Sequence, residues 1–239
     1  MSKIMFLICI FIGSLFADIK VSSSEKQTTM IELFSSEGCS SCPPAEKWIN
    51  NFKNEPELWS KFIPIVYHVD YWDYIGWKDS FAKKEYTLKQ RQYYKNKHLS
   101  GVYTPGFLIN SKEWRAWFNT QKINETDKYP GVLSVNIKNN NMEVTFNQKN
   151  SQYDVNIALL GFGFKTVIKR GENKGEILEH DFVVLEQKTY SLENSIVKTK
   201  LFDVERKAKK HALVVWVTKK NSMNVVQSTG TWIDFSIRK

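Results

Sequence analysis

The chain has 239 residues, of which 42 % are hydrophobic and 25 % are charged, and its formal net charge is +9. These values are ordinary for a globular protein with a buried core, and they exclude a disordered or fibrous chain. The basic balance favours contact with anionic surfaces, but the densest basic run, 206–211, is typical of a solvated loop. We see no nucleic-acid-binding module and expect no nucleic-acid partner.

The first seventeen residues have the pattern of a secretory signal peptide. Lys3 precedes an almost wholly apolar run, 4–16, and Ala17 offers a small residue for cleavage. The run is too short to span a bilayer as a helix, so we predict a signal peptide over 1–17 and an exported, periplasmic or extracellular protein. An uncleaved anchor is the alternative. After cleavage we expect no stable membrane insertion.

A Cys-x-x-Cys pair follows, between a predicted strand at 30–34 and a predicted helix at 45–52. This order places Cys39 near a helix N-terminus, where unpaired N–H groups and the helix dipole favour a thiolate. Once the signal peptide is removed, Cys39 and Cys42 are the only cysteines. Their ring is so short that a disulfide there stabilises little, which favours reactivity over a structural role. We predict that Cys39 is the nucleophile and that Cys42 resolves the mixed disulfide.

A second strand is predicted at 62–69, parallel to the first. Because parallel strands end on the same edge of a sheet, we expect His68 and Asp70 to lie beside Cys39 and to tune the pair. The alternative for His68 is a strand-end histidine bound to a backbone carbonyl. Two thiols with an imidazole also suit copper(I) or zinc, which gives a second hypothesis of metal binding or copper delivery.

The remainder of this half is predicted to contain a loop at 70–79, a helix at 81–97, a strand at 106–110 and a closing helix at 113–121. For the bond before Pro105, base rates favour trans, whereas its place after the cysteine motif favours cis. Aromatic residues near the motif either recognise a partner or wedge the loop onto the sheet, and we favour the wedge: Tyr71, Trp72, Trp77 and Tyr103.

Helical patterns vanish after Tyr129, and short alternating runs indicate an antiparallel sandwich or barrel. The one unusual polar stretch there, 170–175, is interpreted as a hairpin loop. A third hypothesis makes the whole chain a binding module with a structural disulfide. The predicted strands are 132–137, 142–146, 155–160, 182–185, 212–217 and 232–237.

Three runs, 31–45, 68–79 and 102–105, occur together in order and resemble the secreted, thioredoxin-like family catalogued as domain of unknown function 1223. Residues 171–175 and 183–184 also resemble that family's C-terminal half. The resemblance implies a thioredoxin-like fold, a redox pair at the two cysteines and a cis-proline at Pro105 that faces them. Gly106 departs from the family's Gln at that position, which predicts a looser loop there.

We therefore predict an α/β thioredoxin-like domain over 28–128 and an appended all-β, sandwich-like domain over 129–239. The predicted function is exported thiol–disulfide oxidoreduction with protein thiols or disulfides as partners and no cofactor. The predicted site residues are Cys39, Cys42, His68, Asp70 and Pro105.

Overall fold

The computed structural model describes residues 18–120, 122–148, 152–203 and 208–235. The predicted signal peptide lies outside the described residues, and no helix among those residues is long and apolar enough to cross a membrane. The first half contains β1 (Ile19–Ser22), β2 (Thr29–Ser35), α1 (Cys42–Asn50), β3 (Phe62–His68), α2 (Lys84–Lys95), β4 (Gly106–Ile109) and β5 (Lys112–Glu113).

The second half contains strands throughout its described part. These are β6 (Leu133–Lys138), β7 (Asn141–Phe146), β8 (Tyr153–Phe162), β9 (Phe164–Val167), β10 (Ile177–His180), β11 (Val183–Leu192), β12 (Ile196–Lys200), β13 (Lys210–Lys219) and β14 (Val225–Ile233). Three short 3₁₀ turns complete the secondary structure that the structure describes: Asn51–Asn54, Asp73–Ile75 and Ala116–Phe118.

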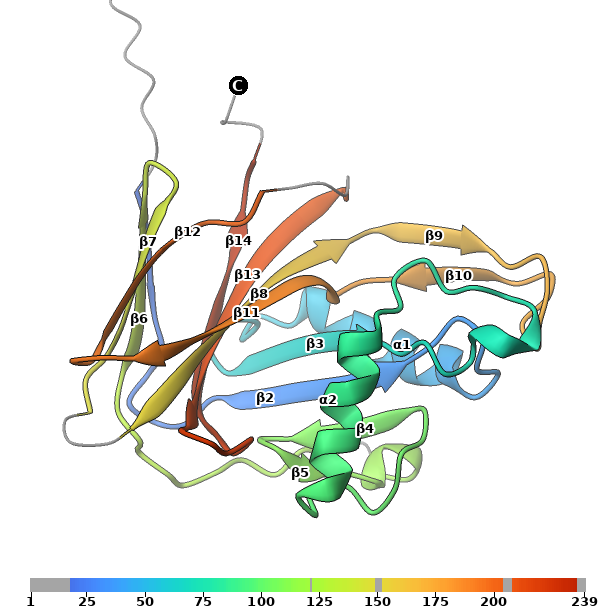
Figure 1. The fold of residues 1–239 in the computed structure, drawn as a ribbon, viewed down its shortest axis with the longest axis horizontal. Helices are drawn as coiled ribbons and strands as arrows, with labels where there is room; N and C mark the ends of the chain where they lie inside the picture. The colour runs from blue at the N-terminus through green and yellow to red at the C-terminus, as the bar shows by residue number, and fades with distance from the viewer. Residues whose placement is uncertain (1–17, 121, 149–151, 204–207, 236–239) are drawn as a thin grey trace, which may run out of the picture.

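One eight-stranded sheet, in the order β14-β13-β8-β11-β3-β2-β4-β5, runs across the molecule (Figure 1). β2 and β3 are parallel, as predicted, and α1 connects them. β11 joins β3 through a parallel pairing of Val183 with Val66, and β2 pairs with β4 in antiparallel fashion. Strands from both halves of the chain therefore share one sheet.

A four-stranded sheet, β1-β6-β7-β12, packs against the half of the long sheet that contains β8 and β13. Because side chains alternate along a strand, β8 contributes to two cores. Val155 and Ile157 pack towards the smaller sheet, whereas Ala158 and Leu160 belong to the core around β2 and β3. This alternation explains why nearly all of β8 is buried.

The two helices cover opposite faces of the other half of the long sheet, with α2 in front and α1 behind in Figure 1. Tyr86 and Tyr93 of α2 are buried in the same core as Phe34 of β2. Every residue of β2 is buried, as expected for a strand with both faces covered.

The predicted fold class, an α/β thioredoxin-like domain with an appended all-β domain, is wrong. The described residues form fourteen strands and two α-helices, so the fold is β-rich. The strands of the second half do not close a separate sandwich on their own, because β11 pairs with β3 and extends the sheet that holds β2. The division of the chain near residue 129 stays a sequence-based prediction.

Most local predictions in the first half are confirmed, including the strands at 30–34 and 62–69 and the helices that became α1 and α2. The closing helix predicted at 113–121 is wrong. Glu113 pairs with Leu108 as part of β5, and the described residues from 114 to 120 contain a single 3₁₀ turn and no α-helix. Trp114 and Trp117 instead both pack on Phe107. Their three-residue spacing resembles the apolar period of a helix, although the chain there is not helical.

Candidate functional site at the cysteine pair

The two cysteines lie where β2 ends and α1 begins. Ser35 closes β2, Ser41 is the N-cap residue of α1, and Cys42 is its first residue. The backbone N–H of Cys42 donates to the carbonyl of Cys39 at 3.1 Å, which folds the motif into a tight turn. Both cysteines are free thiols, and each is 1 % exposed. The site is therefore a buried pair of free thiols.

The surroundings of the two thiols shift their pKa values in opposite directions. Hydrogen bonds from Cys42, which has the largest effect, and from Ser41 and Thr104 together lower the pKa of Cys39 to about 6, against the opposing effect of burial. The Ser41 hydroxyl lies 3.3 Å from the Cys39 sulfur. Cys39 is therefore largely a thiolate at neutral pH.

Cys42 is the protonated partner. Burial raises the pKa of the Cys42 thiol well above its usual range, and the neighbouring Cys39 raises it further. The Ser35 hydroxyl contacts this thiol and also donates to Glu46. Cys42 thus donates a hydrogen bond that stabilises the Cys39 thiolate, and it needs to lose its proton before it attacks.

The Thr104–Pro105 peptide bond is cis, as the family resemblance implied. Thr104 contributes a hydrogen bond to Cys39, and its hydroxyl accepts one from the Trp72 indole at 2.7 Å. Gly106 was expected to loosen this loop. Instead, the Gln90 side chain donates to the carbonyl of Tyr103 at 2.6 Å, and a Cβ on Gly106 would lie 2.9 Å from that same oxygen.

His68 and Asp70 have partners other than the sulfurs. Nδ1 of His68 lies 2.7 Å from Asp79 Oδ2, and since a carboxylate only accepts, the ring nitrogen is the donor. The Thr87 hydroxyl donates to Asp70 at 2.5 Å, which ties Asp70 to α2. The structure therefore places His68 in a carboxylate cluster and Asp70 against a helix.

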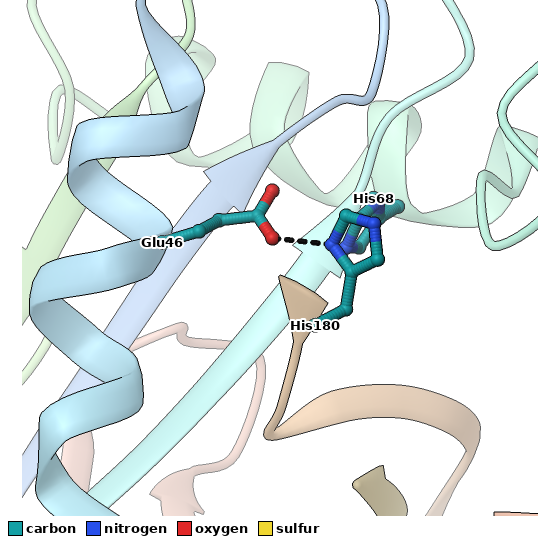
Figure 2. Close-up of side chains that lie close together, drawn as sticks. All are labelled: Glu46, His68 and His180. Carbon is teal, nitrogen blue, oxygen red and sulfur yellow. Dashed lines mark hydrogen bonds and ion pairs between the residues drawn. The ribbon is translucent and has the colours of Figure 1, made fainter. Parts of the chain in front are cut away.

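Sequence reasoning missed that cluster. Glu37 and Glu46 flank His180 on its two ring nitrogens, and all three side chains are buried. Burial lowers the pKa of His180, but attraction by Glu46 and contacts with Glu37 outweigh it and raise the pKa to about 10. Figure 2 shows Glu46 directed at His180, with His68 beside it. His180 is 134 residues from Glu46, so no local pattern reveals the pairing.

The hairpin loop predicted at 170–175 is confirmed, since β9 and β10 are antiparallel partners on either side of it. It also covers the cysteine motif, which the sequence did not indicate. Asn173 donates to the carbonyls of Glu37 and Cys39 at 2.8 and 3.1 Å, and Glu172 accepts from the backbone of Ser40 at 3.1 Å. Its unusual polarity was the one available signal.

The aromatic residues near the motif hold the loop in place. Trp77 donates to Glu37 at 2.8 Å, and Trp72 is bound to Thr104. Tyr71 and Trp72 also pack against the core that contains β2 and β3. This arrangement agrees with the prediction that the aromatic loop wedges onto the sheet.

Together, the fold and the site define a β-rich protein that presents a Cys-x-x-Cys thiol pair at the carboxyl end of a buried strand. The chain belongs to the family described as "Protein of unknown function (DUF1223)", whose model matches residues 30–218. Membership of domain of unknown function 1223, which the sequence resemblance implied, is thereby confirmed, but the thioredoxin-like fold that it also implied is not. No curated protein matches the chain.

Two solved structures are similar to this one. An X-ray crystal structure of a protein from Agrobacterium tumefaciens has 23 % identity and a TM-score of 0.60, covering 88 % of this chain and 95 % of that one. HBP35 of Porphyromonas gingivalis has 12 % identity and a TM-score of 0.57, covering 89 % of this chain and 77 % of that one. At these identities the likeness concerns the fold alone.

Proposed function

We propose that this protein is an exported thiol–disulfide oxidoreductase whose redox pair is Cys39 and Cys42. The observation that carries the proposal is the split in acidity, with the pKa of Cys39 lowered to about 6 and that of Cys42 raised. A nucleophile and a protonated resolving thiol are the two groups that disulfide exchange requires. Export rests on the apolar run at 4–16.

In the reduced protein, the Cys39 thiolate attacks one sulfur of a substrate disulfide, and the other sulfur leaves as a thiolate that takes up a proton. Cys42 then loses its proton, attacks the Cys39 sulfur and releases the second substrate thiol. The substrate gains two electrons, and the protein is left with a Cys39–Cys42 disulfide. The reverse sequence oxidises a substrate dithiol.

The cover over Cys39 limits which substrates react. Because the pair is buried, a protein substrate needs the 170–175 loop or the 70–79 loop to move aside. The contacts that hold the former loop to the motif are hydrogen bonds from Asn173 and to Glu172. Partner thiols or disulfides in extended, accessible segments fit this access best.

The alternative of metal binding at the sulfurs with His68 has less support. His68 is bound to Asp79, and among the described residues the potential three-ligand group that includes His68 contains neither sulfur. A binding module with a structural disulfide would not require two thiols with different pKa values, so this alternative leaves that difference unexplained.

The pH dependence of alkylation checks the acidity of Cys39. The rate of carbamidomethylation of the reduced protein is expected to rise with pH and to reach half its maximum at pH about 6, because only the thiolate reacts. Cys42 is expected to stay unmodified over the same range. Mass spectrometry of each peptide gives both rates, and a half-maximum near the usual thiol pKa of about 8.5 would contradict the assignment.

Trapping tests the function itself. The Cys42→Ser variant retains the proposed nucleophile but lacks the resolving thiol, so it is expected to accumulate one equivalent of mixed disulfide with a disulfide-bearing test protein. The adduct is expected at Cys39 and is expected to dissociate with dithiothreitol. If the variant is folded and the substrate disulfide is accessible, absence of an adduct would contradict the proposal.

A further inference from the structure

A buried cluster of ligand-type side chains lies apart from the sulfurs. Glu46 projects from α1, His68 from the end of β3 and His180 from the end of β10 (Figure 2). One ligand atom from each residue lies within 4.8 Å of the others, and all three residues are buried. Ligand-type side chains from three separate elements thus converge on one buried point.

Each histidine is oriented by a carboxylate on its far side. Nδ1 of His68 is bound to Asp79 Oδ2 at 2.7 Å, and its Nε2 has no hydrogen-bond partner among the described residues. Nε2 of His180 lies 3.2 Å from Glu37 Oε1, and Nδ1 lies 2.5 Å from Glu46 Oε2. A carboxylate behind an imidazole is the usual second-shell support of a metal-bound histidine.

One nitrogen of the cluster has no partner among the described residues. Nε2 of His68 is buried and, within the part of the chain that the structure describes, forms no hydrogen bond. Nε2 of His180 differs, because it forms an ion pair with Oε1 of Glu37 at 3.2 Å. A buried ring nitrogen without a partner is costly, and a bound ion at Nε2 of His68 is one of the few ways to satisfy it.

The charge of the cluster favours a cation. Three buried carboxylates, those of Glu37, Glu46 and Asp79, face two imidazoles. Among the described residues, no lysine or arginine forms an ion pair with any of the three. A metal ion binds neutral imidazoles and displaces any proton on the coordinating nitrogens. The three carboxylates would then hold three negative charges, which a divalent cation would largely offset.

We propose that the Glu46 carboxylate, Nε2 of His68 and Nδ1 of His180 bind a divalent transition-metal cation of the zinc class. Two imidazoles and one carboxylate suit zinc, iron or nickel, whereas calcium and magnesium prefer oxygen ligands and copper(I) prefers sulfur. The bound ion would tie the β9–β10 hairpin to α1 and β3. The loop of that hairpin covers Cys39.

The test uses the full chain, stripped with a chelator, and Zn²⁺ or Co²⁺ as the probe. The decisive protein is the Cys39→Ser/Cys42→Ser double variant, which removes the sulfurs and keeps the cluster. We expect it to bind one equivalent of Zn²⁺ and to unfold at a higher temperature as Zn²⁺ is added. Co²⁺ is expected to give ligand-field bands without a thiolate charge-transfer band.

Loss of binding in the double variant would place the metal at the cysteines and overturn the proposal, as would absence of binding by the wild-type protein. His180→Asn is expected to weaken Zn²⁺ binding at least about 100-fold, and Asp79→Asn about 10- to 100-fold. His98→Gln is the matched control, because His98 lies outside the cluster and is bound to the carbonyl of Ser111. We expect this variant to bind Zn²⁺ with the affinity of the wild-type protein. Equal affinity of His180→Asn and His98→Gln would also overturn the proposal.

Discussion

Replacing Cys39 with serine is expected to reduce disulfide exchange to the rate measured without protein. A serine hydroxyl stays protonated at neutral pH, whereas the pKa of the Cys39 thiol is lowered to about 6. The measurement is the exchange of electrons between the purified variant and a dithiol substrate, followed by the appearance of substrate disulfide.

The Cys42→Ser variant is the matched control for this loss. It removes a sulfur of equal burial from the same turn, yet it keeps the proposed nucleophile. We expect it to complete the first attack and to stop there, so the two single variants differ in the step at which they fail. Unchanged exchange by Cys39→Ser would reject Cys39 as the nucleophile.

Replacing Asp79 with alanine is expected to cost roughly 3–5 kcal/mol of folding free energy, the usual loss when one partner of a buried charged pair is removed. Asp79 accepts from His68 at 2.7 Å, from the backbone of Glu37 at 2.9 Å and from the backbone of Phe81 at 2.8 Å. The variant leaves these three donors buried without this acceptor. Equilibrium unfolding in urea measures the loss.

Two further variants control the Asp79 experiment. Asp79→Asn keeps the size and one acceptor oxygen, so its loss is expected to be smaller than that of alanine. Asp127→Ala removes an aspartate that is 99 % exposed and is expected to change stability by no more than about 0.5 kcal/mol. Equal stability of Asp79→Ala and Asp127→Ala would show that the buried network does not hold the motif in place.

Local patterns predicted the elements around the cysteines well. The run at 30–34 and the helical spacing after Cys42 correspond to β2 and α1, and the parallel pairing of β2 with β3 followed from their order. These features depend on periodicity and connectivity, which a sequence displays directly. The same patterns predicted that Cys39 lies just before a helix, and α1 begins at Cys42.

Strand partners were not predictable in the same way. An alternating run shows which side chains share a face, but it does not show which strand lies alongside. The pairing of Val183 with Val66 joins residues far apart in the chain and merges what the sequence presented as two units. The β-rich fold class follows from this pairing and from the small helix content.

Only part of the candidate site was predictable, for a similar reason. The two cysteines lie within four consecutive residues, and the cis bond before Pro105 followed from a family resemblance. His180, Glu46 and Asn173 come from three separate elements, and only the folded chain brings them to the motif. In the sequence, nothing distinguishes these three residues from ordinary polar residues of a helix, a strand or a hairpin.

A redox titration of the Cys39–Cys42 pair tests the central claim most directly. The protein is equilibrated in buffers of defined thiol–disulfide ratio, free thiols are alkylated, and the oxidised fraction is counted by mass. A redox-active pair predicts a midpoint between about −270 and −120 mV, the range of catalytic exchangers. A midpoint below about −300 mV is typical of a structural disulfide and would contradict the proposed function.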